Sequence, residues 1–150
     1  MKIEKYDYTK NPEFADQVID LLLAESEEIA ATGVDRNHVR KLLQGKVVCL
    51  VATESGKLLG AAIAATGAAW FNPSVVCMRD LLLWIAPEHR GGTVFQRLLH
   101  ALEDEARIQR VNKLYLNQST GIDVEKTSRL YRKMGFVLTG FLSVKEMNHV

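Results

Sequence analysis

A glycine-containing turn between two apolar segments is the part of the sequence whose residue types and spacing most suggest chemistry. Arg90-Gly91-Gly92-Thr93 follows an apolar, strand-like run that ends before Pro87, and a helical pattern begins directly after it. The first N–H groups of a helix lack main-chain partners and lie at the positive end of the helix dipole, so they attract anions. The glycines allow close approach, Arg90 adds a charge and Thr93 adds a hydroxyl donor. This pattern predicts a phosphate or pyrophosphate site.

A second interpretation of the turn is open from its residues alone. It can be an ordinary glycine turn beside a solvated arginine, which would bind no ligand. If it does bind phosphate, nucleoside triphosphates and dinucleotides are disfavoured, because the GxxxxGK[ST] and GxGxxG fingerprints are both absent. The pattern therefore favours a different ligand that carries a phosphate or pyrophosphate group.

Apolar periodicity and capping residues predict the elements that position this turn. Helices are expected over residues 11–31, 35–45, 92–110 and 124–134, and strands over 47–53, 58–70, 75–86 and 113–117, with a last strand or strand pair over 136–147. Turns are expected at Glu54-Ser55-Gly56-Lys57 and Asn72-Pro73-Ser74, and a polar loop over 118–123. Gly60 lies inside an expected strand, which predicts tight packing at that position.

The order of these elements predicts an α/β fold with a mixed sheet. Residues 75–117 form a strand, a helix and a strand, and such a crossover places two parallel strands in one sheet. Ligands of these sheets bind at the carboxyl ends of the strands, where Arg90-Gly91-Gly92 lies. At 150 residues the chain is expected to form a single domain over residues 1–150.

Charge and composition argue against several classes of partner. The 19 basic and 18 acidic side chains leave a formal net charge of +1, so the strong positive field that binds nucleic acid or an anionic membrane is missing. Cys49 and Cys77 lie within apolar runs, which predicts two buried, reduced thiols and no disulfide or metal site. A charged N-terminal segment and apolar stretches too short for a membrane span predict a cytoplasmic protein.

Two sequence motifs lie in order along the second half of the chain. The first is Ile85-Ala86-Pro87-Glu88-His89-Arg90-Gly91-Gly92-Thr93-Val94-Phe95 followed by Leu98-Leu99, and the second is Leu130-Tyr131-Arg132-Lys133-Met134-Gly135-Phe136. Both are similar to motifs of the GNAT family of acyl-CoA-dependent N-acetyltransferases, which the chain therefore resembles. The resemblance implies the GNAT fold, with a sheet of roughly six to seven strands flanked by about four helices. It also implies acetyl-CoA as the cofactor.

The resemblance further implies where acetyl-CoA binds. The main chain at Leu83 and Ile85 would pair with the amides of its pantetheine arm, opposite a strand that ends at Asn117. Its pyrophosphate would lie on Arg90, Gly91, Gly92, Thr93, Val94 and Phe95. The sequence departs from the family pattern at Thr93 and Phe95, which stand where the family has glycine or alanine, and at Val124 and Thr127, which replace an asparagine and an alanine.

Candidate catalytic and acceptor-binding residues carry alternatives. The resemblance makes Tyr131 the acid that protonates the leaving thiolate; the alternative is a tyrosine that only packs on the sheet. Asp80 interrupts an apolar strand, so its carboxylate is expected to be the catalytic base or to pair with Arg79 or another neighbour. Glu25 and Glu28, near the end of the first helix, either bind a cationic amine or belong to a solvated face.

Three functions are open at this stage. The first is transfer of an acetyl group from acetyl-CoA to a primary amine of a small molecule, peptide or protein. The second, favoured by Thr93 and Phe95, is a GNAT-fold binding or interaction protein without turnover. A nucleic-acid-binding module rests only on Arg129, Arg132 and Lys133, and the balanced charge argues against it. Trp70, Phe71 and Trp84 are expected in the core or a cleft wall, and an edge strand could pair two copies into a homodimer.

Overall fold

A computed structural model describes residues 1–7, 9–45, 47–117, 124–140 and 143–147 of the chain. The chain divides into two compact units, residues 1–115 and residues 116–150, which are described in turn. The first unit has the element order β1 Lys2–Lys5, α1 Phe14–Glu25, α2 Glu27–Thr32, α3 Arg36–Gln44, β2 Val47–Glu54, β3 Lys57–Ala69, β4 Asn72–Ile85, the 3₁₀ turn η1 Pro87–His89, α4 Thr93–Ile108 and β5 Lys113–Tyr115.

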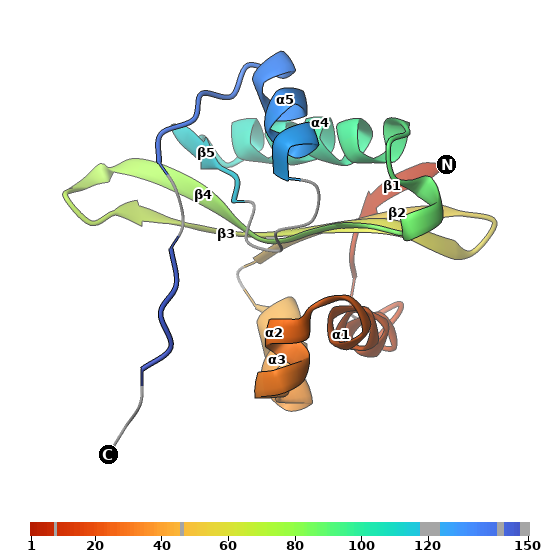
Figure 1. Cartoon of the computed structure of the whole chain (residues 1–150). Helices are drawn as coiled ribbons and strands as arrows, with labels where there is room; N and C mark the ends of the chain where they lie inside the picture. Colours follow the sequence, from red (N-terminus) through yellow and green to blue (C-terminus); the bar gives the residue numbers. More distant parts are fainter. Residues whose placement is uncertain (8, 46, 118–123, 141–142, 148–150) are drawn as a thin grey trace. The chain divides into compact units, whose positions relative to one another are not determined.

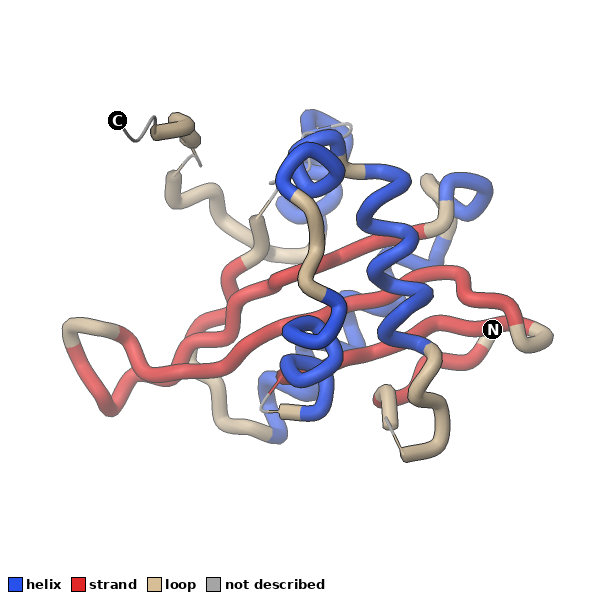
Figure 2. The backbone as a smooth tube through the Cα atoms, turned by 90° about the horizontal axis from the view of Figure 1, so that it is seen from below, coloured by secondary structure: helices blue, strands red, loops and turns tan. Residues whose placement is uncertain are grey.

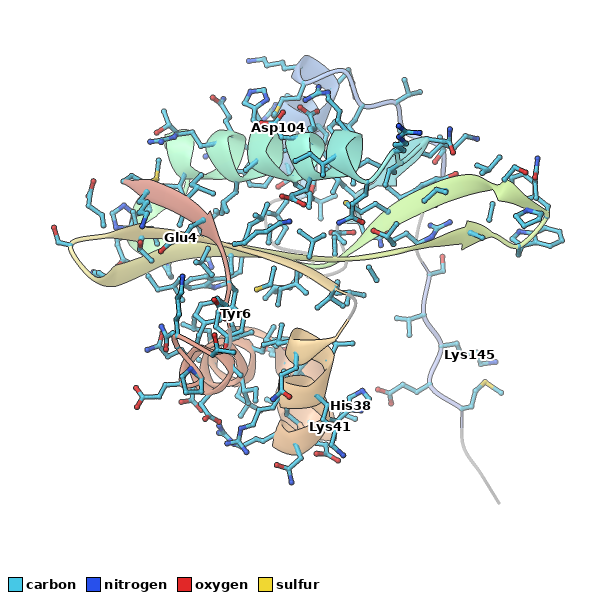
Figure 3. All side chains as sticks on the ribbon, turned by 180° about the vertical axis from the view of Figure 1, so that it is seen from behind. Glu4, Tyr6, His38, Lys41, Asp104 and Lys145 are labelled. Carbon is cyan, nitrogen blue, oxygen red and sulfur yellow. The ribbon has the colours of Figure 1, made fainter. Side chains whose placement is uncertain are left out.

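The first unit is built on a five-stranded sheet in the order β1-β2-β3-β4-β5 (Figure 1). Strands β1 to β4 run antiparallel to their neighbours, whereas β5 pairs with β4 in parallel after the crossover through α4. Helices α1 to α3 cover one face and α4 covers the other; Figure 3 shows Tyr6 on the α1 side of the sheet and Asp104 on α4. The predicted α/β class and mixed sheet are confirmed, with five strands among the described residues instead of six to seven.

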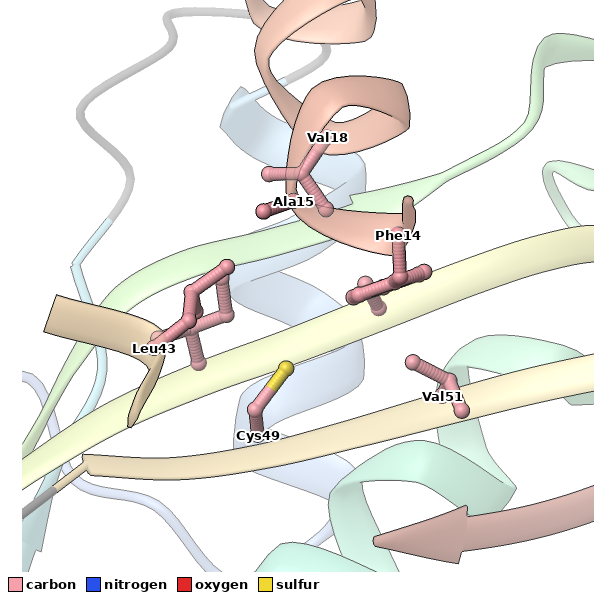
Figure 4. Packing of buried hydrophobic residues seen from close by; sticks show 8 residues of the cluster. Phe14, Ala15, Val18, Leu43, Cys49 and Val51 are labelled. Carbon is pink, nitrogen blue, oxygen red and sulfur yellow. The ribbon is translucent and has the colours of Figure 1, made fainter. Parts of the chain in front are cut away.

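Hydrophobic residues of the helices and the sheet form a core on the α1 face (Figure 4). The cluster consists of Phe14, Ala15 and Val18 of α1, Leu43 of α3, Cys49 and Val51 of β2, and Ala61 and Ile63 of β3. Cys49 and Cys77 are buried free thiols, as predicted. Burial disfavours the thiolate and raises the pKa of Cys49 to about 12, so this residue packs as a small hydrophobic side chain.

The opposite face of the sheet packs closely against α4. Three leucines of this helix have no exposed surface: Leu98, Leu99 and Leu102. At Gly60 of β3, a Cβ atom would lie 2.8 Å from the main-chain oxygen of Trp84 and 2.9 Å from side-chain carbons of Ile85 and Leu98. The tight packing predicted at Gly60 is therefore confirmed, and it brings the end of β4 and α4 against β3.

Residues 11–31 form two helices instead of the single predicted helix. The first begins at Phe14, and residues 11–13 lie outside it. The chain leaves helical geometry at Ser26, whose hydroxyl accepts a hydrogen bond from the N–H of Ile29 at 3.2 Å and caps α2. Serine side chains compete for main-chain bonds and favour caps over helix interiors, so Ser26 starts a new helix. Asp35 caps the helix predicted over 35–45, because its carboxylate accepts from the N–H of His38 at 3.0 Å.

The turn between β3 and β4 is formed by Trp70 and Phe71, so the turn predicted at Asn72-Pro73-Ser74 is wrong. Ala69 pairs with Asn72 and closes the hairpin over two residues, while Pro73 lies in β4 where the ladder is interrupted. Trp70 is 95% exposed and Phe71 is 61% exposed, so the expectation that they belong to the core or a cleft wall is also wrong. Trp84 is buried, as expected.

The second unit contains α5, Val124–Lys133. Gly135 follows this helix with a φ of +89°, which confirms it as the residue that ends the predicted helix. In the described parts of residues 136–147 the predicted strand is absent, and Val137 and Leu138 are exposed. Strand propensity reflects the fit of a side chain to a half-buried pleated surface, which these two residues lack. The predicted loop over 118–123 lies outside the described residues.

Candidate anion-binding site at the end of β4

The main chain of β4 changes the direction that it presents to its neighbours at Leu81. Before this residue, the main-chain N–H and C=O groups of even-numbered residues point toward the β5 side. The Val76 carbonyl accepts from the N–H of Asn112, and the Val76 N–H donates to Asn112 Oδ1, both at 2.8 Å. Main-chain groups point alternately to the two edges of a strand, so those of Asp80 also point toward the β5 side. Leu81 is then the extra residue of a β-bulge, because the pairing with β3 skips it.

After the bulge, the main-chain groups of the odd-numbered residues Leu83 and Ile85 point to the outer edge of β4, away from β3. The N–H of Ala86 donates to the carbonyl of Leu59 in β3 at 2.9 Å, so the even-numbered residues here face β3. The carbonyl of Ile85 accordingly accepts a hydrogen bond from Nε of Arg90, at 3.0 Å. Leu83 and Ile85 are the same two residues whose main chain the family resemblance assigns to a ligand.

The outer edge of β4 is open beside Leu83 and Ile85. Strand β5 is short, and its pairing with β4 ends at Arg79 and Tyr115, where the guanidinium carbon lies 4.1 Å from the centre of the tyrosine ring. Beyond Arg79, no strand in the described part of the chain pairs with this side of β4. An open strand edge pairs readily with an extended ligand that carries amides. The bulge and the short β5 together create such an edge.

The turn after β4 leads directly into the start of α4. Gly91 has a φ of +81°, a left-handed conformation that glycine adopts without strain. Gly92 is the N-cap of α4, and it has no side chain to accept from the first N–H groups of the helix. A Cβ atom at Gly92 would meet only the carbonyl oxygen of His89, at 3.4 Å. A ligand can therefore approach the main chain here closely, as an anion-binding turn requires.

Thr93, Val94 and Phe95 form the first turn of α4. Val94 is buried and anchors the helix, Thr93 is exposed, and Phe95 is half-buried. Side chains on a helix lean toward its N-terminus, so the Phe95 ring leans toward the turn that would hold an anion. The departure at Phe95 from the family pattern therefore falls beside the candidate site.

A lysine that no sequence pattern revealed compensates the acidic residue of the turn. Nζ of Lys57, at the start of β3, lies 2.9 Å from Oε1 of Glu88. The hydrogen bond and the charge of Lys57 hold the pKa of Glu88 below its ordinary value. A carboxylate beside an anion site would repel the ligand, and Lys57 reduces that repulsion. Lys57 lies far from the turn in sequence and could be found only through the β2–β3 hairpin.

An apolar pocket lies between α1 and the sheet. It is lined by Val18, Leu21 and Leu22 of α1, Ala61 of β3, and Leu82 and Trp84 of β4. Leu82 and Trp84 alternate with Leu83 and Ile85, so the pocket and the open edge are formed by the same four-residue segment of β4. Periodicity identified these residues as apolar, but only the bulge explains which of them line the pocket.

The remaining predicted site residues occupy several elements. Asp80 is half-buried in β4, next to the bulge, and pairs with Ala64 of β3. Glu25 ends α1 and Glu28 lies in α2, on either side of the break between the two helices. Asn117 and Tyr131 belong to the second unit; in it, the Tyr131 ring lies 5.7 Å from that of Phe136. The open strand edge, the glycine turn and the apolar pocket are therefore formed by first-unit residues alone.

A mixed sheet with a bulged, open strand edge that runs into a glycine turn and a helix defines an α/β protein with a candidate site for an extended anionic ligand. The Acetyltransferase (GNAT) domain family matches residues 45–138, a range that includes β4, the turn and α5. The chain belongs to the GNAT family of acetyltransferases.

Individual relatives are consistent with this family. The chain is 32% identical over 109 residues to an IAA acetyltransferase of Azospirillum brasilense, a match that covers 71% of this chain and 67% of the relative. A ribosomal-protein-alanine N-acetyltransferase from Brucella melitensis biovar Abortus 2308 has a similar structure, with a TM-score of 0.71, 20% identity and coverage of 98% of this chain and 100% of the other. An aminoglycoside N-acetyltransferase in complex with CoA has a TM-score of 0.70, 14% identity and coverage of 99% and 100%.

None of the helices in the described part of the chain combines the length and hydropathy that a membrane span requires.

Proposed function

We propose that the protein is an N-acetyltransferase that moves an acetyl group from acetyl-CoA to a primary amine by direct attack. The observation that carries the proposal is the continuity of the open edge at Leu83 and Ile85 with the turn at Gly91 and Gly92. An extended, amide-containing arm joined to a pyrophosphate is complementary to an open strand edge joined to an anion-binding turn. Membership of the GNAT family supports the same ligand.

Acetyl-CoA fits the residues that are present. Gly92 leaves room for a phosphate at the start of α4, because a Cβ there would have only one close neighbour. Lys57 compensates Glu88, so the turn does not present an unpaired carboxylate to an anion. Arg90, Gly91, Gly92, Thr93, Val94 and Phe95 would hold the pyrophosphate, and Leu83 and Ile85 would hold the pantetheine arm. When bound, acetyl-CoA supplies an activated thioester carbonyl that a neutral amine attacks.

The chain then has to supply two proton transfers. The amine must lose a proton as the C–N bond forms, and we assign Asp80 as the base because it lies in β4 beside the bulge. The thiolate that leaves as the C–S bond breaks takes a proton, and we assign Tyr131 as the donor. Asn117, after β5, is assigned as a further contact of the ligand arm.

The acceptor is proposed to be a primary amine of a small molecule, peptide or protein. The pocket beside Leu82 and Trp84 is lined by apolar side chains but has room for no more than a water molecule, so it does not itself hold a side chain of the acceptor. Glu25 and Glu28, at the break between α1 and α2, would attract the amine in its cationic form. The relatives named above act on chemically different acceptors and do not choose among them.

Calorimetry with acetyl-CoA and CoA tests the proposal directly. We expect saturable binding of one ligand per chain, followed by amine-dependent release of CoA with at least one member of a panel of primary amines that includes phenethylamine and spermidine. Absence of binding at high ligand concentration would contradict the enzyme proposal.

A second candidate, a GNAT-fold binding protein without turnover, is favoured by one departure from the family pattern. Phe95, half-buried in the first turn of α4, stands where the family has a small residue, and a ring at this position would leave less space for a phosphate. Failure to bind acetyl-CoA, or binding without CoA release on any amine, would favour this candidate over the enzyme.

A further inference from the structure

The tip of the β3–β4 hairpin exposes two aromatic side chains that the proposed function does not use. Trp70 and Phe71 are both largely exposed, and their rings lie 5.7 Å apart in an edge-to-face arrangement. They form the turn itself, and Figure 2 shows the hairpin running beyond the other strands. Neighbouring exposed aromatic side chains at one tip of a protein indicate an interaction surface.

Behind this tip, the hairpin is a two-stranded ribbon. Strand β2 pairs with β3 only as far as Ala65, and β5 pairs with β4 only from Cys77 onward. Among the described strands, residues 66–69 and 72–75 therefore have no neighbour outside the hairpin. A two-stranded ribbon is marginally stable in water unless it packs against another surface.

The two outer edges of the ribbon differ in whether a strand of another molecule can pair with them. On β4, Pro73 lacks an N–H group and the ladder is interrupted between Asn72 and Val76, which blunts that edge. On β3, residues 66–69 are Thr-Gly-Ala-Ala, with neither a proline nor a charge. By contrast β1, at the edge of the sheet, carries Lys2, Glu4 and Lys5.

In the described part of the chain, no strand pairs with the main-chain groups of this unprotected edge. The Leu59 carbonyl accepts from the N–H of Ala86, directly after β4, so the main-chain groups of odd-numbered residues of β3 face β4. Thr66 and Ala68 consequently point their N–H and C=O groups outward, beyond the end of β2. A Cβ atom at Gly67, between them, would have nothing within 4 Å, so the space along this edge is open.

The lack of charged side chains in the ribbon indicates which kind of partner it can bind. Residues 58–78 contain no charged side chain, so the ribbon has no electrostatic attraction for an anionic lipid surface or a charged peptide. A second copy of the same edge is complementary, because an antiparallel pair about a two-fold axis matches the outward donors of each chain with the outward acceptors of the other.

We propose that this edge and tip form a homodimer interface, in which residues 66–69 of two copies pair as antiparallel strands. Aromatic side chains bury roughly 150–250 Å² each, so Trp70 and Phe71 of the two copies, at opposite ends of the paired strands, supply at most about 600–1,000 Å². The paired edges bring the total toward the roughly 1,200 Å² that marks the smallest stable interfaces. The ribbon lies at the start of β4 and the anion-binding turn follows its end, so the interface leaves the site free.

Analytical ultracentrifugation over a wide range of protein concentrations tests the proposal. We expect the wild type to dimerise reversibly and Trp70→Lys to weaken dimerisation at least about tenfold, because it places a charge at the tip. Ala68→Pro, which removes one outward N–H, should weaken it similarly. The matched control is Leu42→Lys, which removes a partly exposed apolar side chain from α3 and should dimerise like the wild type.

Circular dichroism and acetyl-CoA affinity give the second readout, and both should be unchanged in Trp70→Lys, whose side chain is almost fully exposed. A wild-type protein that stays monomeric at all concentrations would overturn the proposal, even if it bound lipid vesicles or another protein. Dimerisation of Trp70→Lys at wild-type strength would overturn it as well. Because the readout is molecular mass, the result is independent of whether the protein acetylates an amine.

Discussion

Nε of Arg90 donates a hydrogen bond to the main-chain oxygen of Ile85 at 3.0 Å, across the turn that joins β4 to α4. The acceptor is a carbonyl of the open strand edge, and the donor belongs to the residue predicted to attract phosphate. Arg90 therefore holds the end of the strand and the candidate anion-binding turn together, in addition to providing charge. Arg90 thus has a structural role through its hydrogen bond and an electrostatic role through its charge, and substitutions can test the two roles separately.

Replacement of Arg90 should lower both stability and affinity. Arg90→Ala removes the hydrogen bond and the charge, so we expect a loss of about 0.5–1.5 kcal/mol in the free energy of unfolding and weaker acetyl-CoA binding. Arg90→Lys restores the charge without the planar guanidinium, so it should recover part of the affinity but little of the stability. Urea unfolding and calorimetry measure the two effects, and wild-type stability in both variants would show that the hydrogen bond is unimportant.

Gly92→Asp should stabilise the free protein and abolish acetyl-CoA binding. Gly92 already has the extended backbone of an N-cap, with φ −93° and ψ −162°, and aspartate at this position accepts from the first N–H groups of the helix. The gain is a few tenths of a kcal/mol from the cap, plus about 0.3–1 kcal/mol from the helix dipole. The same carboxylate occupies the anion site and repels phosphate.

Gly92→Ser is the control for that experiment. Serine caps the helix without a charge, so its melting temperature should also rise while acetyl-CoA binding is largely retained. Equal affinity of the aspartate variant and the wild type would place the pyrophosphate elsewhere.

Phe95→Ala should improve acetyl-CoA binding. The half-buried ring leans toward the turn, and alanine at this helix position restores the space that family members have there. Alanine is a strong helix former, so the helix itself is not weakened. A thermal shift measured with and without acetyl-CoA separates the outcomes: destabilisation without a larger ligand-induced shift would mean that Phe95 only packs in the core.

The sequence predicted more of the fold than of the site, for a physical reason. Periodicity of apolar residues revealed α4 and its buried leucines, because burial acts on every turn of a helix. The bulge at Leu81 has no such signature: it depends on the pairing of β4 with β3, and it determines which main-chain groups are open. Lys57 could not be linked to Glu88 for the same reason, since a hairpin brings them together.

Two local predictions from the sequence were wrong because a single interaction outweighed the propensity of its segment. Asn72-Pro73-Ser74 has the composition of a turn, yet Ala69 pairs with Asn72 and the aromatic residues Trp70 and Phe71 form the turn. Ser26 divides a predicted helix because its hydroxyl caps the next one. In each case one side chain or one pair outweighed the average propensity of its segment.

Gly60→Ala should strongly destabilise the protein. Its Cβ would lie 2.8 Å from a main-chain oxygen, that of Trp84, which cannot move without displacing the end of β4. We expect a cost of about 1–3 kcal/mol, as for overpacked core positions, together with weaker acetyl-CoA binding. Gly67→Ala in the same strand is the control, because its Cβ would meet nothing and stability should not fall. Wild-type stability of Gly60→Ala would contradict the close packing of β3, β4 and α4.

Tyr131→Phe should reduce turnover without changing acetyl-CoA affinity. Phenylalanine keeps the ring and its packing beside Phe136 but lacks the proton, and general acids contribute about 10²- to 10⁴-fold to rate. The maximal rate with one fixed amine should fall by that order, with an unchanged KM for acetyl-CoA. Loss of stability together with weaker binding would instead assign the hydroxyl a structural role, and full activity would exclude it as the acid.

We propose that acetyl-CoA binds along the outer edge of β4 with its pyrophosphate on the turn before α4. An acetyl-CoA titration followed by ¹⁵N–¹H NMR of the assigned main-chain amides measures this binding site directly. We expect saturable shifts at Leu83 and Ile85 and the largest shifts over residues 91–95, all of them lost in Gly92→Asp. Saturable binding that leaves these amides unshifted, or that persists in Gly92→Asp, would contradict it.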